Sequence, residues 1–118
     1  MKILIVGLNP SKLAGKSPSL KTLNKWLEQL GLRTCSFINL YEKDICPEQC
    51  QIDLIRKVVT VNQYDAVICL GSTVSKQLYL NDIDHFRLPH PSPRNRQLNN
   101  KKYVYNELLA CKNYLNGG

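Results

Sequence analysis

Long hydrophobic runs are absent from this chain of 118 residues. The apolar stretch in MKILIVGLNP is too short to cross a membrane, and no small-residue cleavage site of a signal peptide follows it. We therefore expect an intracellular protein that does not bind membranes. The length predicts a single domain over residues 1–118 with a modest apolar core.

A disulfide framework and a metal site also lack support. The five cysteines are an odd number, and Cys46 and Cys50 form a single C-x3-C pair with no second pair to complete four ligands. Neither G-x-G-x-x-G nor a complete G-x-x-x-x-G-K-[ST] loop occurs, so a dinucleotide or nucleoside triphosphate site has no support. We expect no metal, no cofactor and incidental or buried thiols.

Acidic residues are missing from both end segments of a chain whose net charge is +7. Residues 1–27 hold five lysines and no acid, and residues 85–106 hold five basic residues and no acid. If the two segments meet in the fold, they form one basic face of the kind that binds a polyanion such as DNA. If they do not meet, the charge only keeps the surface soluble.

A strand followed by a helix is predicted four times. Ser19 is the expected N-cap of the first helix, and Gly31 is expected to end it. The strands read as continuous apolar runs, which is typical of a parallel sheet covered on both faces. The predicted fold is α/β, a three-layer α/β/α sandwich around a four-stranded parallel sheet. The predicted strands are 2–7, 33–40, 65–71 and 85–88, and the predicted helices are 19–32, 51–62, 72–80 and 101–114.

The polar residues of interest fall in the loops that follow the four strands, at 7–19, 39–48, 71–73 and 89–96. Ligands of open α/β sheets bind beyond the carboxyl ends of the strands. Asn9 and Asn39 offer amides that donate and accept hydrogen bonds, and the Gly71-Ser72 turn precedes a helix whose first N–H groups favour anions. Each of these features alone is also compatible with an ordinary turn or strand end.

The last of these loops, LPHPSPRNR, places prolines at positions 89, 91 and 93. Proline fixes φ and donates no hydrogen bond, so the segment is expected to be a rigid loop. Such a loop would hold His90, Ser92, Arg94 and Asn95 in place, with Asn95 bracing it. His85 precedes a strand and is expected to be structural.

GLNPS and HPSPRN resemble the first and second motifs of the uracil-DNA glycosylase superfamily. The nearest patterns are those of its single-strand-selective monofunctional and mismatch-specific branches. FINLYE and VICLGSTVSKQL look like further family segments, in the same order. The resemblance implies a monofunctional enzyme that flips uracil or a modified pyrimidine out of DNA, hydrolyses its N-glycosidic bond and leaves an abasic site.

The resemblance also implies a role for each motif residue. Asn9 would orient the attacking water, and His90 would donate a hydrogen bond to the base O2 as negative charge builds there. Gly7, Leu8 and Asn39 would bind the base, with Asn39 reading its Watson–Crick edge. Arg94 would enter the space that the base vacates. The implied DNA and phosphate contacts are Pro10, Ser11, Ser72, Ser92, Arg94, Asn95 and Arg96.

Two departures from the family pattern keep other functions open. The family places an aromatic residue shortly after its first motif to stack on the base, and AGKSPSLKTL contains none. The chain is also short for this family. The alternatives are a non-catalytic module that binds a nucleotide, a modified base or nucleic acid, and an enzyme that acts on free nucleotides.

Overall fold

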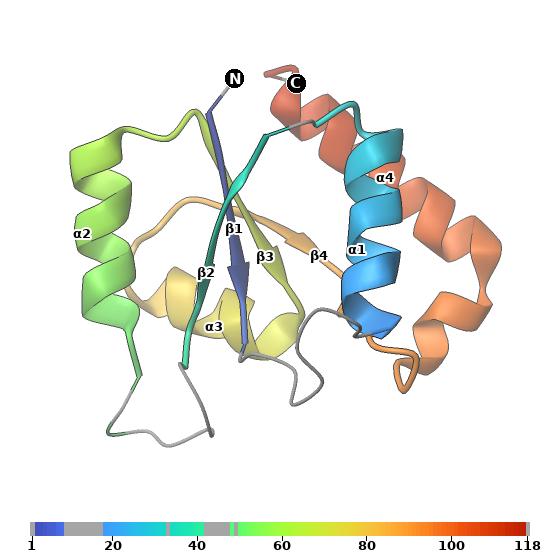
Figure 1. The fold of residues 1–118 in the computed structure, drawn as a ribbon, viewed down its shortest axis with the longest axis horizontal. Coiled ribbons are helices and arrows are strands. Elements are labelled where there is room, and N and C mark those ends of the chain that lie inside the picture. The colour runs from blue at the N-terminus through green and yellow to red at the C-terminus, as the bar shows by residue number, and fades with distance from the viewer. Residues whose placement is uncertain (1, 9–17, 33, 42–47, 49, 118) are drawn as a thin grey trace.

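The computed structural model describes residues 2–8, 18–32, 34–41, 48 and 50–117 (Figure 1). Asn9, Pro10 and Ser11 of the first motif lie outside the described residues. In chain order the elements are β1 (Ile3–Gly7), α1 (Pro18–Gln29), β2 (Ser36–Asn39), α2 (Ile52–Asn62), β3 (Ala66–Leu70), α3 (Ser72–Leu80), β4 (Phe86–Leu88), the 3-10 helix η2 (Arg96–Asn99) and α4 (Lys101–Leu115).

All four strands are parallel, in the order β2-β1-β3-β4. The register pairs Gly7 with Asn39 across β1 and β2, and Leu70 with Leu88 across β3 and β4. Both central strands are buried along their whole length, as their continuous apolar runs predict. The predicted α/β class with a four-stranded parallel sheet is confirmed.

Helices cover both faces of the sheet, so the domain has three layers (Figure 1). Ile3 and Ile5 of β1 point to the face covered by α1 and α4, where Trp26 and Leu108 are buried. Leu4 and Val6 point to the opposite face and pack with Ile55 of α2 and the buried residues of α3. This alternation of successive side chains places the central strands β1 and β3 between two apolar clusters.

Gly31 ends α1 as predicted. It adopts φ +75°, and two backbone bonds run from Gly31 N to Glu28 O and from Leu32 N to Leu27 O. This pattern is a Schellman motif, which glycine favours because it has no Cβ. The prediction that Ser19 caps the helix is wrong, because the helix begins at Pro18, and proline is suited to a first helical turn.

The remaining differences from the predicted elements are small. β2 begins at Ser36 rather than at residue 33, and the 3-10 helix η2 was not predicted. No helix in the described ranges is long and apolar enough to span a membrane.

Candidate active site at the carboxyl edge of the sheet

Two glycines form the centre of the sheet edge where the strands end. Gly7 is the last residue of β1, and Gly71 directly follows β3. A Cβ atom on Gly7 would lie 2.6 Å from Asn39 Oδ1, and one on Gly71 would lie 3.4 Å from His90 Cβ. The two central strands therefore end without side chains, and the flanking strands place Asn39 and His90 against those ends.

Asn39 is held in place by the backbone around it. Leu40 N donates to Gly7 O at 2.8 Å, and the Gln51 side chain donates to the Asn39 carbonyl at 3.0 Å. The first bond extends the pairing of β1 and β2 past Asn39, and the second ties Asn39 to the residue that precedes α2. The Asn39 side chain is half-buried beside Gly7, and its amide can both donate and accept.

His90 lies in the rigid loop that follows β4. Pro89 and Pro91 on either side of it are buried, and Gly71 N donates to Leu88 O at 2.8 Å where the loop begins. Ser92 N donates to His90 Nδ1 at 3.1 Å. Because Nδ1 accepts this bond, the proton of the neutral ring is on Nε2, and Nε2 can donate to a ligand.

Burial supports the same protonation state. The His90 pKa is lowered because desolvation disfavours the charged imidazolium. A neutral imidazole with Nε2–H is therefore the form that predominates at neutral pH.

Asn95 braces the loop as predicted. Its Nδ2 donates to His90 O at 2.9 Å, its Oδ1 accepts from Gln97 N at 3.2 Å, and its backbone N donates to Ser92 O at 2.9 Å. One side chain thus ties the His90 backbone to the first turn of η2. Ser92 Oγ accepts from Arg94 N at 3.2 Å, which leaves its hydroxyl hydrogen available to donate.

We expect Asn95→Asp to lower the free energy of unfolding by about 1–2 kcal/mol, because the aspartate keeps the acceptor for Gln97 N but cannot donate to His90 O. Chemical denaturation would measure this loss. Asn100→Asp is the matched control, since the Asn100 side chain caps α4 by accepting from Tyr103 N and aspartate accepts equally well. Equal stability of the Asn95→Asp variant and the wild type would show that the bond to His90 O contributes nothing.

A hollow of about 370 Å³ opens beside His90. Its polar lining includes Arg87 of β4, Gln97 of η2 and Tyr103 of α4, which the sequence analysis did not single out. Ser72, the exposed first residue of α3, lines the same hollow, and its expected contact with the DNA stays a prediction. Alternation along HFRL could have indicated that Arg87 is an exposed residue of a strand beside the loop.

The basic residues of the C-terminal segment lie near this edge. Arg94 and Arg96 are exposed in the loop and at the start of η2, and Lys101 and Lys102 are exposed at the start of α4. The helices α1 and α4 cover the same face of the sheet, so parts of the two basic end segments do share a layer. Lys2 does not join them, because it lies at the opposite edge, where its side-chain Nζ donates to Asn62 O.

Leu8 and Phe37 take opposite positions around Gly7. The Leu8 side chain packs with the apolar cluster under α2 and α3, so it is turned away from Asn39. Phe37, which the sequence analysis did not single out, brings Cζ to within 3.0 Å of the position a Gly7 Cβ would take. Only the pairing of β1 with β2 reveals this contact.

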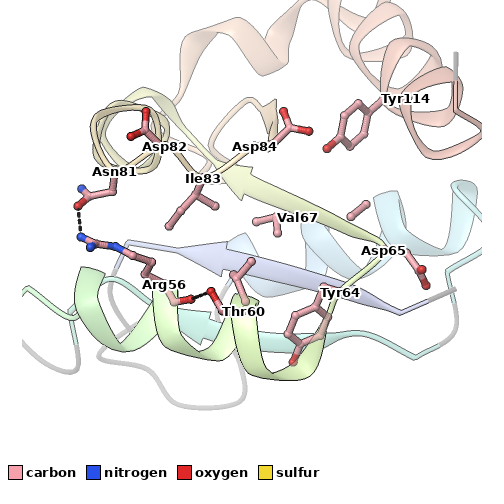
Figure 2. A pocket seen from close by; sticks show the side chains of 12 residues that line it. Arg56, Thr60, Tyr64, Asp65, Val67, Asn81, Asp82, Ile83, Asp84 and Tyr114 are labelled. Atoms are coloured by element: carbon pink, nitrogen blue, oxygen red, sulfur yellow. Dashed lines mark hydrogen bonds between the residues drawn. The ribbon is translucent and has the colours of Figure 1, made fainter.

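A second hollow, of about 520 Å³, lies at the opposite edge of the sheet (Figure 2). Arg56 and Thr60 of α2 line one side of it, and Asp82 and Asp84 of the α3–β4 connection line the other. Asp65 also lines this hollow, so it holds three carboxylates, and these would repel a phosphate backbone. Both its charge and its place at the amino ends of the strands disfavour it as a nucleic-acid site.

His85 is structural, as predicted. Its Nε2 lies 2.8 Å from Ser75 Oγ and its Nδ1 lies 2.8 Å from Ile83 O. Both ring nitrogens are therefore engaged within the fold, which leaves neither free to act on a ligand.

The buried thiols are unsuited to nucleophilic or metal chemistry. Burial raises the pKa of Cys69 and of Cys111 to about 12, so both remain protonated at neutral pH. Among the described residues, no three His, Cys, Asp or Glu side chains are grouped so that they could hold a metal ion.

The site is thus an amide and a neutral imidazole that flank two glycines at the carboxyl edge of a parallel sheet, next to exposed cations. This arrangement defines an α/β protein with a candidate site for a small planar polar ligand. Residues 1–110 match the sequence profile of the uracil DNA glycosylase superfamily, and the chain belongs to that superfamily. No curated protein matches the chain.

Proposed function

We propose that this protein is a monofunctional DNA glycosylase that hydrolyses the N-glycosidic bond of uracil or a modified pyrimidine. The observation that carries the proposal is the state of His90, whose Nδ1 accepts from Ser92 N and whose Nε2–H is free to donate at the sheet edge. Membership of the superfamily supports DNA as the partner and a uracil-type base as the target.

The reaction breaks the bond between sugar C1′ and base N1. The electron pair of that bond stays on the base, and negative charge builds on its O2 as the sugar becomes oxocarbenium-like. A hydrogen bond from His90 Nε2–H to O2 stabilises that charge more in the transition state than in the ground state. A water oxygen then bonds to C1′ and loses a proton to the solvent, and the departing base anion takes up a proton from the solvent, which gives the free base and an abasic site. The proposed role of Asn9 is to orient the attacking water.

Asn39 is proposed to read the other edge of the base. The strand order places β1 and β3 between β2 and β4, so about 14 Å separates the axes of the two outer strands. Side chains that reach inward from both sides can therefore contact opposite edges of one pyrimidine ring. The Asn39 amide can donate to a base carbonyl and accept from the ring N–H.

The DNA backbone is proposed to pass over the exposed loop residues. Ser72 and Ser92 offer hydroxyl donors, and Arg94 and Arg96 offer cations on either side of Asn95. Pro10 and Ser11 of the first motif are the remaining proposed contacts with the DNA, whereas Gly7 and Leu8 are proposed to bind the base. Neutralisation of phosphate charge by cations such as Arg94 and Arg96 supplies most of the sequence-independent affinity for DNA.

A second candidate is a module on the same fold that binds a modified base or nucleic acid without cleaving it. The absence of an aromatic residue between positions 9 and 17 favours this candidate, because a flipped base is normally held by stacking.

Base release from oligonucleotides that contain one uracil decides between the two candidates. We expect abasic sites, seen as alkali-labile breaks, in single- or double-stranded DNA with uracil and none in the matched DNA with thymine. Salt-sensitive binding of the same DNA without breaks would contradict the glycosylase and support the binding module.

A further inference from the structure

Phe37 is a large apolar side chain that the fold leaves outside its core. It lies in β2, an edge strand of the sheet (Figure 1), and its side chain is 51% exposed. It belongs to neither of the two apolar clusters, whereas the next residue, Ile38, packs against one of them. Burial therefore does not account for an aromatic residue at this position.

The surroundings of Phe37 place it in the candidate site. Phe37 and Asn39 are two residues apart on one strand, so their side chains lie on the same face of the sheet. Both side chains reach Gly7: a Cβ there would lie 2.6 Å from Asn39 Oδ1, 3.0 Å from Phe37 Cζ and 3.5 Å from Phe37 Cε1. An aromatic ring and a hydrogen-bonding amide thus adjoin the same backbone position at the carboxyl edge.

We propose that Phe37 is the aromatic residue on which the extruded base stacks, an inference that rests on the proposed glycosylase function. A flipped base is usually held by stacking on an aromatic side chain together with hydrogen bonds to its Watson–Crick edge. Asn39 supplies the hydrogen bonds and Phe37 supplies the ring, and both residues lie on the same face of β2, two positions apart. Phe37 therefore compensates for the lack of an aromatic residue after the first motif.

The other exposed aromatic side chains do not fit this role. Tyr79 and Tyr105 are more exposed, at 77% and 65%, but they belong to α3 and α4 and are absent from the contacts of both glycines. Phe86 is half-buried and packs against the ring of Tyr114, with centroids 5.4 Å apart. Trp26 is buried in the core under α1. Tyr103 lines the hollow beside His90, on the β4 side of the sheet and away from β2 and Asn39.

Phe37→Ala is expected to lower kcat/KM for uracil release, and the affinity for single-stranded DNA with uracil, by about 10–100-fold, which is the range for loss of one base–aromatic stack. Phe37→Tyr is expected to retain both, because it keeps the ring. Phe37→Leu keeps the bulk without the ring and is expected to behave as Phe37→Ala. Tyr105→Ala is the control for loss of an exposed aromatic residue elsewhere.

Affinities are measured by fluorescence anisotropy with labelled DNA that contains uracil or thymine, and thermal unfolding checks each variant. If the wild type releases uracil and Phe37→Ala matches it in both measurements, the stacking role is overturned and the glycosylase stands. If the wild type releases no uracil, the proposed glycosylase function is overturned, and the affinity measurements alone then test the stacking role of Phe37. Selective loss of uracil binding in Phe37→Ala and Phe37→Leu, but not Phe37→Tyr, would then support stacking, and equal affinities would overturn it.

Discussion

Replacement of His90 by alanine is expected to reduce base release by about 10²–10³-fold, which is the usual cost of removing one donor to a developing anion. The donor lost is Nε2–H, whose place is fixed because Nδ1 accepts from Ser92 N. Single-turnover release of uracil from single-stranded DNA would measure the chemical step directly. Affinity for the same DNA is expected to change little, since the bond to O2 strengthens mainly in the transition state.

His85→Ala is the matched control for this experiment. That ring contacts Ser75 and Ile83 within the fold, so its removal is expected to lower stability by about 1–2 kcal/mol and to leave base release unchanged. Wild-type rates in His90→Ala, with the fold intact, would remove His90 from the reaction.

The pH dependence of the wild type tests the protonation state of the same residue. Because the His90 pKa is lowered by burial, the neutral ring persists below the usual value of about 6.5, and base release is expected to stay level through that pH.

The same lowered pKa determines how the stability of the fold changes with pH. Below pH 6.5 the unfolded chain takes up the proton first, so His90 makes the protein less stable as pH falls, until the pH passes below its lowered pKa in the fold.

Much of the architecture could be predicted because the apolar patterns are local. The runs ILIVG and AVICL are apolar at every position, which is typical of strands buried on both faces of a parallel sheet, and both are buried parallel strands. Gly31 could be recognised as a helix end because the left-handed conformation at that position favours glycine. The helix η2 could not, because four residues capped by Asn95 show no periodicity.

The candidate site could be predicted only in part, because its residues meet through the sheet rather than along the chain. His90 and Asn95 could be connected from the sequence, since one loop holds both. The contacts of Gly7 with Asn39 and of Gly71 with His90 depend on strand order and register. The position of Phe37 depends on β2 being an edge strand, which no local pattern in FINL reveals.

Gly7→Ala is expected to reduce base release by about 10²-fold while it changes the free energy of unfolding by less than about 1 kcal/mol. The new Cβ would lie 2.6 Å from Asn39 Oδ1 and 3.0 Å from Phe37 Cζ, so both side chains must move. These atoms are the ends of side chains, so the two side chains can move without unfolding the protein. The movement displaces them from the positions that the proposed site requires. Single-turnover release and chemical denaturation measure the two effects separately.

Gly31→Ala is the matched control, and the opposite result is expected for it. Gly31 has φ +75° and nothing within 4 Å of an added Cβ, so alanine there strains the backbone by about 1–2 kcal/mol and touches no side chain of the site. Loss of stability without loss of activity in Gly31→Ala, beside the reverse in Gly7→Ala, would assign Gly7 to the site rather than to the fold. The new Cβ atom and the Asn39 amide cannot occupy the same space. If Gly7→Ala kept full activity, the Asn39 amide could therefore not read the base from its present position.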